Sequence, residues 1–157
     1  MKSYQKAVQF HGHNCPGLAM GWRMTKAALD HFSSERAVDE EMVAIVENDA
    51  CGVDAVQFLS GCTFGKGNLI FKDYGKMIYT FYHRASGKAV RISRKSGFRT
   101  KLYDTQISGE ERINLILTAS EKDIVQIEKI NMPEPEYSRI FDTVLCNICG
   151  ESVVESK

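Results

Sequence analysis

Residues 11–17, with the sequence His-Gly-His-Asn-Cys-Pro-Gly, constrain the local fold more than any other stretch of the chain. Pro16 suits the first residue of a helix, because its missing N–H is one that a helix start leaves unpaired anyway. On an extended segment, side chains two positions apart point to the same side, so His11, His13 and Cys15 are predicted to face one cavity. Cys15 would then lie at the positive end of the helix dipole, which favours the thiolate over the thiol. The stretch predicts a metal-ligand cluster; the alternative is a tight turn with exposed histidines and a core cysteine.

A second cysteine is predicted in a similar setting. Residues 42–47 read as a buried strand, and a helix is predicted to begin close to Cys51. Cys51 therefore also feels a helix start, and we interpret this thiol as a further metal ligand or a catalytic group. Asp49 is predicted either to cap this helix or to shuttle a proton.

The glycine-rich loop over residues 60–68 follows that helix. Its spacing does not fit a nucleotide-binding P-loop, which needs four residues between its first glycine and the Gly-Lys pair and then Ser or Thr. We expect instead a loop whose backbone approaches a ligand closely, with an ordinary helix stop and turn as the alternative. Within it we assign Cys62 and Lys66 to the catalytic group and Thr63, Gly65 and Asn68 to ligand binding.

From residue 69 onward the pattern changes to strands rich in β-branched and aromatic side chains. The predicted strands are 69–71, 77–82, 89–94 and 124–130, of which the first three form an antiparallel meander. The predicted helices are 3–10, 16–32, one beginning near Cys51 and one opening at Gly109. The predicted fold class is α+β, an antiparallel sheet with helices packed on it, and 157 residues suffice for one domain with a real core.

A Pro133-Glu-Pro135 pair marks the plausible linker. It divides a core domain, residues 1–132, from a C-terminal tail, residues 133–157. The tail carries Cys146 and Cys149 in a CxxCG knuckle, which is half of a tetrahedral zinc site, an incomplete zinc finger. The other half must come from another chain, or the knuckle binds no metal.

Charge and cysteine usage limit the function classes. Twenty basic residues balance twenty acidic ones and are spread along the chain, so a general attraction to nucleic acid or to a membrane surface is not expected. The N-terminus leads into no apolar run, so we expect no signal peptide. Five cysteines without a secretion signal indicate a reducing compartment, and we expect a cytoplasmic protein.

Several motifs occur together in an order that resembles the FmdE-like family, named for a component of formylmethanofuran dehydrogenase. They are His11-Gly-His13-x-Cys15-Pro-Gly with Gly21-x-Arg23-Met24, Asn48 to Ala55, Gly61 to Asn68, and Asp73-Tyr74-Gly75-Lys76. The resemblance extends from His11 to about Arg94, and the C-terminal knuckle is similar to the appended zinc finger of that family but stops short of its second half. It implies an α+β core, a Cys/His metal site, a homodimer and an association with a molybdenum enzyme.

Two functions from different classes follow. In the first, the chain is an enzyme or enzyme subunit in which His11, His13, Cys15 and Cys51 hold a divalent transition metal beside a small-molecule substrate, with zinc as the first choice and iron or nickel as alternatives. In the second, it is a module that binds or delivers a metal or a molybdenum-cofactor fragment for a partner oxidoreductase. A metal-free cysteine nucleophile, Cys51 with His13 as base, is a third interpretation.

Overall fold

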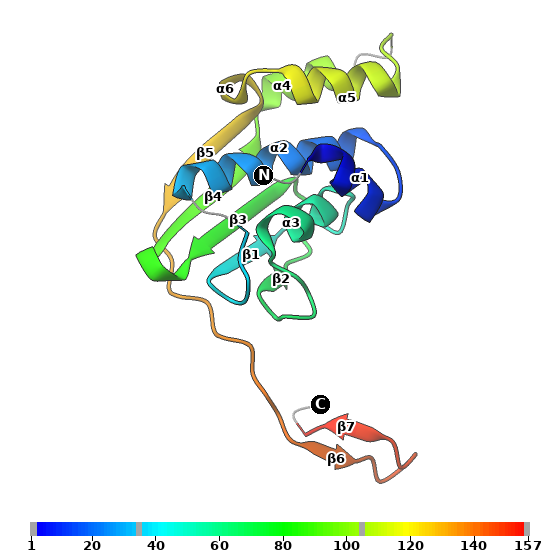
Figure 1. The fold of residues 1–157 in the computed structure, drawn as a ribbon, viewed down its shortest axis with the longest axis vertical. Helices are drawn as coiled ribbons and strands as arrows, with labels where there is room; N and C mark the ends of the chain where they lie inside the picture. The colour runs from blue at the N-terminus through cyan, green and yellow to red at the C-terminus, as the bar shows by residue number, and fades with distance from the viewer. Residues whose placement is uncertain (1–2, 34–35, 104–105, 156–157) are drawn as a thin grey trace.

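The computed structural model describes residues 3–33, 36–103 and 106–155, apart from the Lys101 side chain. It confirms the α+β class: a five-stranded, mostly antiparallel sheet carries helices on one face, and a separate two-stranded hairpin follows at the C-terminus (Figure 1). The strands of the main sheet are β1 (Met42–Val46), β2 (Leu69–Phe71), β3 (Ile78–His83), β4 (Lys88–Arg94) and β5 (Val125–Ile130); the hairpin consists of β6 (Thr143–Leu145) and β7 (Ser152–Val154).

The helices lie close to their predicted positions. Helix α2 runs from Pro16 to Phe32 as predicted, while the first helix is shifted by one residue at each end. Two further helices, α4 and α6, were not predicted, because each is short and lacks a clear apolar repeat. The helices of the described residues are α1 (Tyr4–His11), α2 (Pro16–Phe32), α3 (Gly52–Ser60), α4 (Ser96–Leu102), α5 (Gly109–Thr118) and α6 (Glu121–Ile124), with a 3₁₀ turn at Arg84–Ser86.

The sheet order is β2-β1-β3-β4-β5, and it corrects one part of the predicted topology. Strand β2 does not join the antiparallel meander; it pairs in parallel with β1, with Ile45 opposite Ile70. The physical reason is the crossover through α3, since a helix between two strands returns the chain in the same direction. The meander is formed instead by β3, β4 and β5, which are antiparallel.

The main core lies between the sheet and α2. Alternate side chains on β3 and β4 point toward the helices, so Tyr79, Phe81 and Ile92 are almost completely buried. Leu18 and Met24 of α2 cover them and are equally buried. Helix α2 is therefore held as a rigid layer across the sheet, and both of its ends are available to position other elements.

The C-terminal residues leave this core. The segment that follows β5 begins against it: the Arg84 guanidinium donates hydrogen bonds to the Glu134 carboxylate and the Pro135 carbonyl, both at 2.8 Å, and lies 3.6 Å from the ring centre of Tyr137. Beyond it, the hairpin stands away from the sheet and the helices (Figure 1). The division of the chain at residue 132 stays a prediction.

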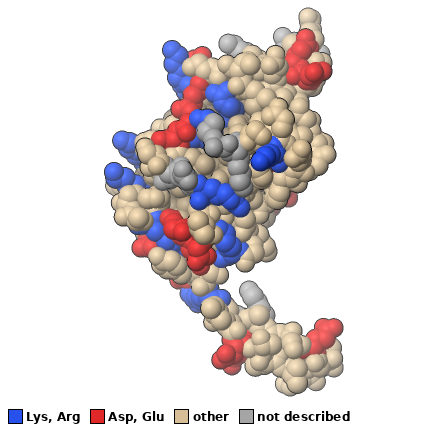
Figure 2. Space-filling model, viewed as in Figure 1, with Lys and Arg blue, Asp and Glu red and all other residues tan. Residues whose placement is uncertain are grey.

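In the part of the chain that the structure describes, no helix combines the length and apolar character needed to cross a lipid bilayer. On the face seen in Figure 2, basic and acidic side chains are interspersed over the core.

Candidate metal centre

Two imidazoles and two thiols converge at the start of α2. One ligand atom of each lies within 4.8 Å of the others, and the residues are His11, His13, Cys15 and Cys51, here called the core cluster. Three of the four are partly buried, and His13 is exposed. The sequence placed the same four residues together, and the geometry brings them within reach of one ion.

The first three residues of the cluster meet in a different way from the one predicted. His11 is the last residue of α1 rather than part of an extended segment, and Gly12 ends that helix in a left-handed conformation with φ of 95°. The chain then folds back so that the rings of His11 and His13 lie 4.4 Å apart, centre to centre. A helix end and a left-handed glycine, not strand alternation, gather these side chains.

Cys15 and Pro16 begin α2 as predicted. The Cys15 sulfur accepts a hydrogen bond from the Leu18 backbone N–H at 3.4 Å and so acts as the N-cap of the helix. The Nε2 atom of His11 lies 3.9 Å from the same sulfur. The cap holds the Cys15 side chain toward the cluster.

Cys51 reaches the cluster because α2 and α3 cross at very close range. A Cβ atom on Gly21 would overlap the backbone of Gly52, and one on Gly17 would lie 3.3 Å from the Cys51 Cβ. Only glycine lets the two helix starts approach in this way. Gly21 and Gly52 therefore set the separation of the Cys15 and Cys51 sulfurs.

Asp54 belongs to the site, and the sequence analysis missed it. Its Oδ2 accepts a hydrogen bond from His11 Nδ1 at 2.6 Å, which leaves Nε2 of the neutral ring free as a lone-pair donor. A carboxylate behind an imidazole is the usual way in which a metal-binding histidine is oriented. The available signal was that Asp54 lies three positions after Cys51, one helical turn along the same face.

The two thiols are not predisposed to ionise together. Burial, followed by the neighbouring Cys15 thiol, raises the pKa of Cys51, although the sequence analysis expected the helix start to favour its thiolate. The loss of water around the sulfur outweighs the helix dipole here. A cation between the sulfurs would reverse this balance, since metal binding deprotonates a coordinating thiol.

A hollow of about 390 Å³ adjoins the core cluster. Its polar lining includes the carboxylates of Asp49 and Asp54, and its aromatic lining comes from Phe64 and Phe71. Asp49 is exposed and does not occupy the cap position of α3, which is Cys51. The hollow offers a small molecule direct access to Cys51 and His11.

The remaining predicted residues of the 60–68 loop lie elsewhere. Cys62 is fully buried, its thiol donates to the Met42 carbonyl at 3.3 Å, and burial raises its pKa to about 11. The Lys66 ammonium donates to the carbonyls of Val38 and Asp39.

Three further loop residues were assigned to ligand binding. Asn68 is buried, accepts from the Thr63 backbone N–H at 2.9 Å and donates to the Met42 carbonyl at 3.0 Å. Gly65 is exposed. The bonded side chains of the loop hold it against the start of β1, and of the whole loop only Phe64 lines the hollow beside the cluster.

Cys146 and Cys149 form a second, separate pair at the turn of the C-terminal hairpin. The Cys146 N–H donates to the Glu151 carbonyl at 2.8 Å, and the Gly150 N–H donates to the Cys146 carbonyl at 2.9 Å. Backbone N–H groups of Cys149 and Ile148 point at the Cys146 sulfur and lower its pKa. The turn is that of a metal-binding knuckle, in which amides stabilise a thiolate.

Comparison with known proteins agrees with this geometry. Residues 10–138 match the model of the family described as FmdE, Molybdenum formylmethanofuran dehydrogenase operon. The chain belongs to the FmdE family. The matched segment contains the whole core cluster and ends before the C-terminal hairpin.

Two relatives extend the comparison of this FmdE chain. A crystal structure described as an FmdE-like protein of tungsten formylmethanofuran dehydrogenase, from Syntrophus aciditrophicus, superposes with a TM-score of 0.75 at 25% identity, covering 99% of this chain and 88% of that one. A protein named as a probable S-adenosyl-L-methionine-binding protein, from Archaeoglobus fulgidus, is 29% identical over 97% of this chain. This chain spans about half of that relative, 49% of its length.

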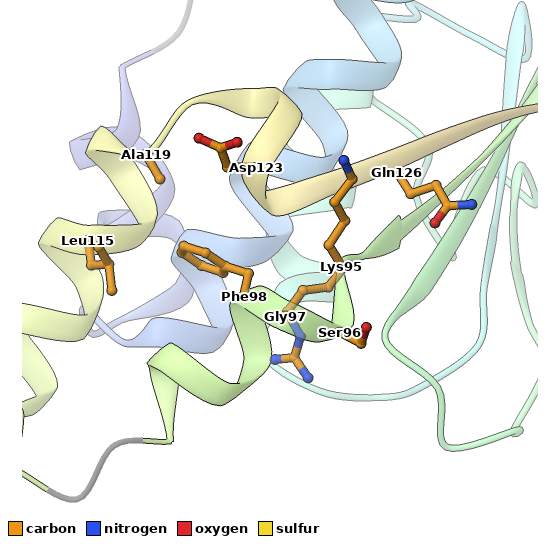
Figure 3. Close-up of a pocket in the computed structure, with 9 residues that line it drawn as sticks. Lys95, Ser96, Gly97, Phe98, Leu115, Ala119, Asp123 and Gln126 are labelled. Carbon is orange, nitrogen blue, oxygen red and sulfur yellow. The ribbon is translucent and has the colours of Figure 1, made fainter.

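A larger hollow, of about 730 Å³, lies elsewhere on the FmdE fold, between α4, α5 and the start of β5 (Figure 3). Phe98 and Leu115 supply its apolar wall, and the Lys95 ammonium is already held by the Lys122 carbonyl at 2.6 Å. It contains no cysteine or histidine, so we place the chemistry at the smaller hollow beside the core cluster.

Proposed function

We propose that this domain holds one divalent transition metal ion in the core cluster and uses it as an enzyme or enzyme subunit acting on a small molecule in the adjoining hollow. The observation that carries the proposal is the convergence of four ligand atoms within 4.8 Å, beside a hollow of about 390 Å³. The proposed ligands are His11, His13, Cys15 and Cys51, and zinc is the first choice of metal, ahead of iron and nickel.

The donor set fits such an ion. Zinc binds thiolate at about 2.3 Å and imidazole at about 2.0–2.1 Å, so the corners of an ideal tetrahedron lie about 3.3–3.8 Å apart. The ligand atoms of the core cluster need to move inward by about 1 Å or less to reach this spacing from their 4.8 Å limit. Soft thiolates with imidazoles favour zinc, iron or nickel over magnesium or calcium.

The residues around the cluster have distinct tasks in this proposal. A bound metal would supply Lewis-acid polarisation of a substrate oxygen. Asp54 orients His11 through the 2.6 Å hydrogen bond. Asp49, exposed at the edge of the hollow, carries protons between substrate and solvent. His13 is the exposed ligand, and its departure would open a coordination position toward substrate.

The test begins with the metal and continues with the open position. Purified full-length chain should contain about one transition-metal ion per cluster by elemental analysis. The cobalt(II)-substituted chain should change its visible spectrum when azide is added, and the change should be larger in His13→Ala, in which one position is already open. A chain that binds no metal at the cluster would overturn the proposal.

Delivery of a metal to a partner oxidoreductase is the competing function, since four protein ligands can saturate a tetrahedral ion. The partly buried sulfurs and the neighbouring hollow favour catalysis, because a delivery site is expected to expose its thiols. Release separates the two: a delivery module should transfer its metal rapidly to a competing chelator, whereas a catalytic site should retain it for hours.

The relative from Archaeoglobus fulgidus suggests a candidate for the small molecule. S-adenosylmethionine carries a sulfonium cation and an aromatic base, and the hollow presents carboxylates at Asp49 and Asp54 with phenyl rings at Phe64 and Phe71. Calorimetric titration of the metal-loaded chain with S-adenosylmethionine tests this, and Asp49→Asn should weaken any binding detected.

A further inference from the structure

The C-terminal hairpin presents two metal-binding groups with no further ligand of their own. Its knuckle directs backbone N–H groups at the Cys146 sulfur, and Cys149 lies exposed beside it. Thiolate zinc sites that hold a fold together take four ligands. Among the described residues, the core cluster is the one group in which three or more metal-binding side chains converge, so Cys146 and Cys149 gain no third ligand there.

The other cysteines and histidines of the sequence are already placed. The sequence has five cysteines and four histidines. Four of these nine residues form the core cluster, Cys62 is buried in the core, and His31 and His83 line a hollow at the far end of α2. A second copy of the hairpin offers the missing pair of thiols.

The hairpin also lacks apolar cover. Ile148 is 96% exposed and Leu145 is 70% exposed, and Phe141 and Val144 are exposed as well. Two strands alone are marginally stable in water, because one pair buries too little apolar surface. On the face shown in Figure 2, the hairpin bears mostly uncharged side chains with small groups of acidic ones. Pairing with an identical hairpin would cover apolar side chains of both copies.

The separation of the hairpin from its own core is not peculiar to this chain. The similarity to the solved structure from Syntrophus aciditrophicus covers 99% of the chain, which includes the residues beyond the sheet. An extended segment that carries a half-site away from its own domain is suited to reaching another molecule.

We infer that Cys146 and Cys149 from two copies of this chain bind one zinc ion between them. Four thiolates then complete a tetrahedral site on a two-fold axis, with each copy contributing the same two residues. This site is independent of the metal that we propose for the core cluster.

The experiment isolates each cysteine pair in the full-length chain. The variant Cys15→Ser/Cys51→Ser retains only the hairpin pair, and it is titrated with Zn²⁺ alone under reducing conditions. We expect binding to saturate at about half a zinc ion per chain, with the mass in light scattering doubling on zinc addition and returning with a chelator. The matched variant Cys146→Ser/Cys149→Ser should bind about one zinc ion, at the core cluster, and lose the zinc-dependent change in mass.

The alternatives give different results. One zinc per chain without a change in mass, no zinc at all, or a disulfide between Cys146 and Cys149 that prevents binding would each overturn the shared site. Failure of the core metal appears in the other variant, so the two proposals can fail separately. Cadmium NMR of the unaltered chain covers the case in which a variant does not fold. It should give an all-sulfur signal with about half the intensity of the mixed nitrogen–sulfur signal, and absence of the all-sulfur signal would contradict the inference.

Discussion

The molecule contains two cysteine pairs that are built in opposite ways. Cys15 and Cys51 are far apart in the sequence and meet only because α2 and α3 cross at Gly21 and Gly52. Cys146 and Cys149 meet through the local hydrogen bonds of one turn. The first pair therefore depends on the whole fold and has its imidazole partners in place, whereas the second is formed locally and lacks partners. The difference separates a site that a domain completes by itself from one that association must complete.

Removing a thiol from the core cluster is expected to have the largest effect on this comparison. Cys51→Ser should abolish stoichiometric metal binding at the cluster, because a hydroxyl is a poor ligand for a soft site. Elemental analysis of the purified variant measures the loss.

The matched control is Cys62→Ala, which alters a buried cysteine that does not contribute to the cluster. It should lose stability but keep its metal. Equal metal content in Cys51→Ser and the unaltered chain would remove the core site.

The helix crossing offers the next largest effect. Gly21→Ala places a methyl group against the backbone of Gly52, so α2 and α3 must separate. Overpacking of this kind costs about 1–3 kcal/mol, which urea unfolding measures. The variant should also bind metal more weakly, because the Cys15 and Cys51 sulfurs move apart.

Gly109→Ala is the control for the crossing, since a Cβ atom at Gly109 meets nothing within 4 Å. It should leave stability and metal affinity nearly unchanged. A Gly21→Ala chain as stable as this control would show that the crossing does not set the geometry of the cluster.

These two regions also show how far the sequence could be interpreted. The start of α2 follows from Pro16, and the hairpin turn follows from the CxxCG spacing, because both are local features. The meeting of Cys15 and Cys51 could be hypothesised from their shared place at helix starts. The glycine contact that produces it depends on the packing of two helices, which no local pattern encodes.

The errors have the same origin. The sequence assigned Cys62 and Lys66 to chemistry because they lie in a glycine-rich loop, but their bonds to backbone carbonyls are tertiary. Strand β2 was assigned to the meander because the strand pattern does not reveal its partner. Asp54 was missed because the hydrogen bond to His11 joins α1 to α3, two elements whose contact could not be foreseen.

An intermediate effect is expected from the carboxylate behind His11. Asp54→Asn keeps the shape of the side chain but weakens the hydrogen bond that orients the ring, so metal affinity should fall about 10–100-fold. Competition with a chromophoric chelator measures the change. Asp49→Asn alters the other carboxylate of the same hollow and should not change metal affinity. Equal losses in the two variants would point to general electrostatic attraction instead of orientation.

A smaller effect should follow from loosening the segment between the core and the hairpin. Arg84→Gln removes the guanidinium that contacts Glu134, Pro135 and Tyr137, at a cost of about 1–3 kcal/mol to local docking. Limited proteolysis near residue 135 should become faster, while metal binding at the core cluster stays the same. Arg91→Gln serves as the control, because Arg91 pairs with Glu128 within the sheet and not with this segment. A simultaneous loss of core metal would show that the two regions are coupled.

The smallest effect is expected from deleting the hairpin itself. Removing residues 142–157 should change the free energy of unfolding of the core by no more than about 0.5 kcal/mol, because the main hydrophobic core contains none of these residues. The comparison is made on metal-free protein at one low concentration, so that neither metal binding nor association adds to stability. Cooperative urea unfolding with an unchanged slope would show that the deleted residues belong to no part of the cooperative core. A large loss of stability would instead mean that the hairpin packs on the core, and the contrast between a self-contained site and a shared one would no longer hold.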